Sequence, residues 1–187
     1  NQEKVEAEEI AIVEIDEASL ETNGQWPWPR DIIADSIVKA YDNGAALVIL
    51  PILFAEKDRM GHDDYLAEVM SQVPVIMGQS ASVKGKGEPV PRGVVVIGED
   101  PKNFIYDYPE AIGPVKELGE VAAGVGMMTT TPELDGVVRR MPLIVQVQDN
   151  YYSTLSLEAL RLFGGKDSYQ VKADEVGVES VRVYGFD

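Results

Sequence analysis

The run I-A-I-V-E-I-D at Ile10 to Asp16 is mostly apolar and β-branched, which is typical of a strand buried on both faces of a sheet. A second run of this kind, A-A-L-V-I-L-P-I-L-F, occupies Ala45 to Phe54. Between them, apolar residues with the spacing of one helix face extend from about Arg30 to Asp42. Two buried strands joined by a helix form a parallel βαβ unit. The sequence therefore predicts an α/β fold that starts with this unit.

The rest of the chain adds further strands and helices. Asp63 can cap a helix whose inward residues would be Tyr65, Leu66, Val69 and Met70. The dipeptide Asp135-Gly136 predicts a hairpin turn between two strands. We expect a central mixed sheet with the parallel βαβ start and a C-terminal antiparallel hairpin, and helices packed on the sheet. The predicted later elements are strands at 73–78, 94–97, 125–130 and 137–147, a helix at 153–163, and short strands at 176–178 and 181–184.

Length and composition fit one globular domain. The chain has 187 residues, of which 45% are hydrophobic, and no segment is convincing as an interdomain linker. We expect a single domain over 1–187, with a lead-in arm at 1–9 and a tail with short strands at 165–187. The longest apolar run, residues 45–55, is interrupted by Pro51 and is shorter than the roughly 20 residues of a membrane helix. Because residue 1 is Asn1 and not Met, we expect a processed or excised piece of a longer protein.

Charge and residue usage exclude several classes of function. The formal net charge of −16 disfavours nucleic acid as a partner, since phosphates attract the opposite sign. Cysteine is absent and there is one histidine, which excludes thiol chemistry and multi-histidine metal sites. Ser82 stands where a nucleophile elbow at 78–82 requires glycine. His62 lies beside Asp63 and Asp64, where a metal or acid–base role competes with the favoured solvated loop-to-helix junction. We predict no catalytic residue, no metal site and no cofactor.

Six residues are candidates for binding a ligand. Asp16 ends the first predicted strand, where open α/β sheets form their crevice, although capping of the next turn is the favoured alternative. Trp26 and Trp28 could wall that crevice, or could form a rigid lid on the core. Arg30 opposes the dipole of its helix, so we expect a carboxylate partner, either Asp16 or Asp135. Of the adjacent pair Arg139 and Arg140, one arginine also needs a carboxylate if it is buried. The candidate ligand-binding residues are therefore Asp16, Trp26, Trp28, Arg30, Asp135 and Arg139.

Several motifs, in order, resemble one known family. They are I-V-E-I-D-E-A-S-L (12–20), W-P-W-P-R (26–30), I-L-F-A-E-K-D (52–58), G-V-G-M-M-T (124–129), D-G-V-V-R-R-M-P-L (135–143) and Y-Y-S-T-L-S-L-E-A-L-R-L (151–162). Together they are similar to the CHASE2 domain, an extracytoplasmic sensory domain of bacterial signalling receptors, over about residues 10–164. Asp16, Arg30, Asp135 and Arg139 occupy their family positions, whereas Pro51 stands where family members usually carry Asp.

The resemblance implies an extracytoplasmic, periplasmic sensor within a protein of the cytoplasmic membrane. In that family one membrane helix precedes the domain, several follow it, and the output module is a cyclase, a kinase or a diguanylate cyclase. The implied partners are an unknown small-molecule or envelope cue and the flanking membrane helices, with a homodimer left open. Two alternatives remain: a small α/β envelope hydrolase that uses paired carboxylates, and a structural or dimerisation module without a ligand.

Overall fold

The computed structural model describes residues 9–82, 89–91, 93–130 and 133–183, so most of the expected lead-in arm lies outside the described residues. Its central sheet has β2 (Val75–Ser82) in the middle, with β1 (Val48–Leu50) and β6 (Gly124–Met127) parallel to it on either side. A fourth strand, β5 (Glu110–Ile112), pairs antiparallel with the end of β2. The expected α/β class, with a mixed sheet and a parallel start, is confirmed.

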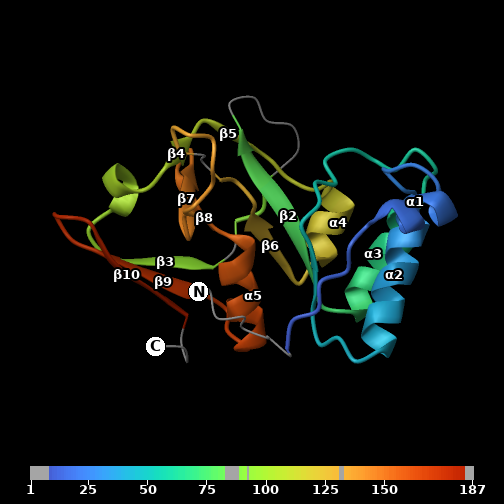
Figure 1. Ribbon diagram of the computed structural model, residues 1–187. Helices are drawn as coiled ribbons and strands as arrows, with labels where there is room; N and C mark the ends of the chain where they lie inside the picture. Colours follow the sequence, from blue (N-terminus) through green and yellow to red (C-terminus); the bar gives the residue numbers. More distant parts are fainter. Residues whose placement is uncertain (1–8, 83–88, 92, 131–132, 184–187) are drawn as a thin grey trace, which may run out of the picture.

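Helices cover both faces of this sheet (Figure 1). Val125 points towards the core formed with α2 (Arg30–Asp42), α3 (Asp63–Gln72) and α4 (Lys116–Val121). Side chains alternate along a strand, so Gly124 and Gly126 face the opposite side. There a Cβ atom on Gly126 would lie 2.5 Å from the backbone of Leu155, in α5 (Leu155–Phe163). The two glycines therefore let α5 lie directly against β6.

Two smaller sheets complete the structure (Figure 1). In one, β9 (Tyr169–Ala173) lies between β10 (Val178–Val183), which is antiparallel to it, and β3 (Val94–Gly98), which is parallel to it. In the other, β7 (Ile144–Val147) pairs with β8 (Asn150–Ser153) and with β4 (Asp107–Tyr108), which follows the short helix η1 (Pro101–Phe104). The β7–β8 and β9–β10 pairs supply the expected C-terminal antiparallel strands.

A buried polar cluster joins α5 to β9. Glu158 is 0% exposed and accepts hydrogen bonds from Arg161 at 2.7 and 2.9 Å and from the Tyr169 hydroxyl at 2.9 Å. Burial, and next the charge of Glu158, raise the pKa of Tyr169 above its ordinary value. Each charge in the cluster has hydrogen-bond partners. The cluster therefore links α5, which packs on the central sheet, to β9 in the C-terminal tail.

The prediction of a buried strand at 10–16 was wrong. These residues belong to no sheet or helix, and Ile12 and Val13 are 91% and 85% exposed. The chain then enters a helix that was not predicted, α1 (Glu17–Asn23). An apolar β-branched run becomes a strand only where a sheet edge pairs with it, and here the parallel start is β1–α3–β2.

Two strands are shorter than predicted. The strand expected at 45–54 ends at Leu50 before Pro51, and the strand expected at 137–147 begins at Ile144, just after Pro142. Proline has no N–H to donate to a strand ladder. The turn predicted at Asp135-Gly136 is present, since the N–H of Gly136 donates to the carbonyl of Glu133 at 2.8 Å. The hairpin predicted around it was wrong, because β6 ends at Met127 and β7 begins at Ile144, and β7 turns into β8 at Gln148, which adopts a φ of 55°.

Most of the remaining predicted elements are present with small shifts. The separate strand expected at 176–178 was wrong, because residues 174–177 form the turn between β9, which was not predicted, and β10. The helix over 30–42 is confirmed at both ends, and the one starting at Asp63 buries Leu66, Val69 and Met70 but leaves Tyr65 40% exposed. Within the part of the chain that the structure describes, no helix has the length and apolar character needed to cross a membrane.

Candidate functional site

The two tryptophans of the Trp-Pro-Trp-Pro-Arg segment have different environments. Trp28 is 6% exposed, belongs to the core, and donates from Nε1 to the carbonyl of Gly24 at 2.7 Å. Trp26 is 39% exposed and meets Trp28 edge to face, with ring centroids 5.8 Å apart. Trp28 is therefore a core residue. Of the two tryptophans, Trp26 is the one that exposes its indole face to solvent.

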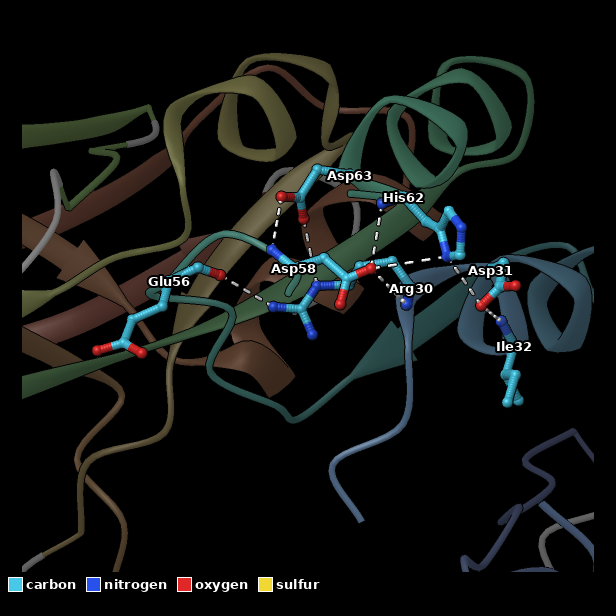
Figure 2. A network of polar contacts seen from close by, with 7 residues as sticks. All are labelled: Arg30, Asp31, Ile32, Glu56, Asp58, His62 and Asp63. Carbon is cyan, nitrogen blue, oxygen red and sulfur yellow. Dashed lines mark hydrogen bonds and ion pairs between the residues drawn. The ribbon is translucent and has the colours of Figure 1, made fainter. Parts of the chain in front are cut away.

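Arg30 begins α2 and is almost enclosed, with a side chain 11% exposed. Its guanidinium lies over the ring of Phe54, 4.3 Å from the centroid, and donates to the carbonyl of Glu56 at 3.0 Å. Its Nε donates to Asp63 at 3.3 Å (Figure 2). The expectation of a carboxylate partner was right, but that partner is Asp63 of α3 and neither Asp16 nor Asp135.

The loop between β1 and α3 completes this arrangement (Figure 2). Asp63 also accepts from the backbone N–H of Asp58 at 2.7 Å, and the Asp58 carboxylate accepts from the backbone N–H groups of His62 and Arg30. Burial opposes ionisation of Asp58, but these backbone donors and the charge of Arg30 outweigh it, so the pKa of Asp58 lies below its ordinary value. We call Arg30, Asp31, Asp58, His62 and Asp63 the α2–α3 junction.

His62 is the least satisfied member of the α2–α3 junction. Its Nδ1 lies 3.2 Å from Oδ1 of Asp31 and 3.7 Å from Oδ2 of Asp58. That atom is buried, although the side chain as a whole is 38% exposed, and it has no hydrogen-bond partner among the described residues. The imidazole therefore faces two carboxylates from two other segments of the chain.

The other candidates lie elsewhere. Asp16 caps α1 by accepting from the hydroxyl and the backbone N–H of Ser19, which lowers its pKa. Asp135 and Arg139 pair with each other at 2.8 Å on an exposed surface, and Arg139 also binds Glu133. In Figure 1 their segment lies near β4 and β7, at the opposite side of the molecule from the start of α2. The crevice expected after a strand at 10–16 is absent with that strand, so the six candidates do not form one site.

Two open pockets lie away from the tryptophans. One, of about 750 Å³, is lined by Tyr106, Glu133, Leu134, Asp135, Arg140, Met141 and Pro142. The other, of about 730 Å³, lies beside α5 and is lined by Pro91, Gly93, Ala123, Arg161, Leu162, Gly165, Lys166 and Asp167. The first pocket, which we call the Tyr106 pocket, combines an aromatic ring, a guanidinium and carboxylates.

Sequence reasoning did not assign Asp58 or Asp31 a role. Asp58 ends the motif I-L-F-A-E-K-D, which indicates a family likeness but no role for this residue. Asp31 follows Arg30 directly. The signal in the sequence that could have identified these residues is the excess of acidic side chains near the starts of α2 and α3. In the described part of the chain, no group of histidine and carboxylate side chains has the geometry of a metal site.

The comparison with protein families decides the relationship. The model of the CHASE2 domain matches residues 1–184, almost the entire chain. The chain belongs to the CHASE2 family. CHASE2 domains are extracellular, non-catalytic sensory domains of signalling receptors. No curated protein and no solved structure matches this CHASE2 domain in the two other comparisons.

Proposed function

We propose that this CHASE2 domain is the extracytoplasmic input domain of a membrane-bound bacterial signalling receptor. It binds a cue in the periplasm and passes a conformational change through flanking membrane helices to a cyclase, kinase or diguanylate cyclase module. The observation that supports this proposal is the family match over residues 1–184. The mechanism is a shift in population, in which a ligand that prefers one arrangement of the domain increases its share.

We propose the Tyr106 pocket as the place where a small-molecule cue binds. Asp135 and Glu133 both line this pocket, and both form ion pairs with Arg139. The side chain of Arg140 is 92% exposed and meets Glu133 only at 3.9 Å, so its guanidinium can also pair with an anionic group of a ligand. Asp16, Trp28 and Arg30 are secondary candidates because their polar groups already have partners within the domain. Trp26 is also secondary, because its exposed ring does not line the Tyr106 pocket.

A hydrolase that uses paired carboxylates has less support. A general acid needs a pKa raised towards neutrality. The pKa of Asp58 is lowered, and so is that of Asp135, through the backbone N–H of Val137 and then Arg139. Both carboxylates are therefore held in their charged form.

Two measurements test the proposed function. The gene on both sides of this chain should encode membrane helices and an output module, and a gene without membrane helices would refute the proposal. In a thermal-shift screen, a small-molecule cue should raise the melting temperature, because it binds only the native state. Arg140→Ala should abolish that rise, whereas Arg182→Ala, an exposed arginine outside the Tyr106 pocket, should preserve it. A rise that survives Arg140→Ala would refute the Tyr106 pocket as the binding place.

A further inference from the structure

We propose that the α2–α3 junction makes this sensor responsive to extracytoplasmic pH through protonation of His62. The inference rests on the proposed function for its biological meaning, but its chemistry depends only on the domain. It concerns a second input, separate from ligand binding in the Tyr106 pocket.

The position of Nδ1 carries the proposal. It is buried, it lies 3.2 Å from a carboxylate oxygen of Asp31 and 3.7 Å from one of Asp58, and it has no hydrogen-bond partner among the described residues. When Nδ1 carries a lone pair, it is a hydrogen-bond acceptor. It then faces two carboxylate oxygens, which are acceptors as well. A proton at Nδ1 gives the imidazole a positive charge, which the nearby carboxylates of Asp31 and Asp58 attract.

The charged groups around His62 come from each segment of the junction. Arg30 and Asp31 belong to α2, Asp58 to the loop, and Asp63 is the first residue of α3, directly after its N-cap His62. The guanidinium of Arg30 directs its hydrogen bonds to Asp63 and to the carbonyl of Glu56. The cation that Asp31 meets most closely is therefore a protonated His62.

Histidine is the type of side chain through which proteins commonly respond to pH between about 5 and 8, and His62 is the chain's one histidine. Asp58, with its lowered pKa, stays ionised there. A proton on the imidazole adds one positive charge beside the carboxylates of Asp31 and Asp58, and its binding tightens the junction.

The junction is also placed to pass on such a change. His62 caps the start of α3, its carbonyl accepts from Leu66 at 3.1 Å, and its N–H binds the loop through Asp58 at 3.1 Å. Asp31 lies in the first turn of α2, directly after the Trp26–Arg30 segment that leads back to α1. Tightening the junction therefore fixes α2 and the preceding segment relative to α3.

The test compares melting temperatures of the 187-residue chain and of His62→Gln at about pH 5.5 and about pH 7.5. The wild type should exceed the variant by roughly 2 to 4 °C at the lower pH, the shift expected for one modest interaction in a domain of this size, and by much less at the higher pH. Asp31→Asn should remove the same pH-dependent part, and it keeps the proposal testable if His62→Gln does not fold.

Tyr65→Phe is the matched control. The Tyr65 hydroxyl donates to Asp35 at 3.0 Å and joins the same two helices. Its hydrogen bond to Asp35, and then the charge of Asp35, raise the pKa of Tyr65, so it does not titrate in this range. Tyr65→Phe should therefore lower the melting temperature equally at both pH values. A wild-type advantage over His62→Gln that is the same at both pH values would overturn the proposal, and it would do so even if the flanking gene sequence confirms a membrane receptor.

Discussion

Arg30 stands in the first turn of a helix, where the dipole disfavours a positive charge. The structure explains this position by burial and pairing. The guanidinium packs on Phe54, donates to Asp63 and to the carbonyl of Glu56, and is 11% exposed. Removing one partner of such a buried pair leaves the other as an uncompensated charge, which costs more than the pair itself contributes.

We expect Arg30→Ala to lower the free energy of unfolding by about 3 to 5 kcal/mol, because Asp63 would remain almost buried without its cation. Urea unfolding followed by circular dichroism would measure the change. The control is Arg139→Ala, which removes an arginine paired with Asp135 and Glu133 but 50% exposed. It should cost roughly 0.2 to 1 kcal/mol, and equal losses in both variants would contradict the buried role of Arg30.

At the scale of elements, the segment at 10–16 and the short strand β1 show how context decides strand formation. Both sequences are rich in β-branched residues. Val48–Leu50 pairs with β2, whereas 10–16 has no partner strand. Burial on the sheet, and not the propensity of the residues, separates the two.

We expect Ile12→Ser to change the free energy of unfolding by no more than about 0.5 kcal/mol, because exposed substitutions remove little buried surface. Ile12 is 91% exposed, while Leu66 of α3 is 0% exposed. Leu66→Ala should therefore cost roughly 2 to 5 kcal/mol in the same urea measurement. A loss at Ile12 as large as that at Leu66 would show that residues 10–16 are packed in the folded domain.

At the scale of the whole molecule, the net charge of −16 means that carboxylates outnumber their cationic partners. Many of them are stabilised by local donors. Asp16 is held first by the Ser19 hydroxyl, Asp174 by the backbone of Val176 and Gly177, and Glu117 by Lys57, and the pKa of each lies below its ordinary value. The folded state therefore binds protons less readily than the unfolded chain does.

This difference in proton binding predicts that the free energy of unfolding falls as the pH is lowered. Groups with a lowered pKa stabilise the fold above their ordinary pKa, and that contribution is lost as pH falls through the folded-state value. The urea midpoint should therefore fall between about pH 5 and about pH 2.5, measured in about 0.3 M salt to screen self-repulsion. Asp16→Asn, which can still cap α1, should lose less over this range than the wild type. A midpoint that stays constant would contradict the prediction.

The sequence identifies several residues of the site, but it does not show which of them lie close together. The need of Arg30 for a carboxylate was predictable from its place in the helix, but the predicted partners were Asp16 or Asp135 and the actual partner is Asp63. Asp63 is 33 residues away along the chain, and only the packing of α3 beside α2 brings it within reach. His62, Asp31 and Asp58 meet for the same reason.

The class of fold, the helix at 30–42, the family and the absence of thiol chemistry could be read from the amino-acid sequence, because each depends on local periodicity, composition or ordered motifs. Three features needed the folded chain: residues 10–16 remain unpaired, Pro51 and Pro142 bound the neighbouring strands, and Asp63 is the carboxylate that neutralises Arg30. Strand pairing and charge pairing depend on distances between segments remote in sequence, which periodicity along the chain does not encode.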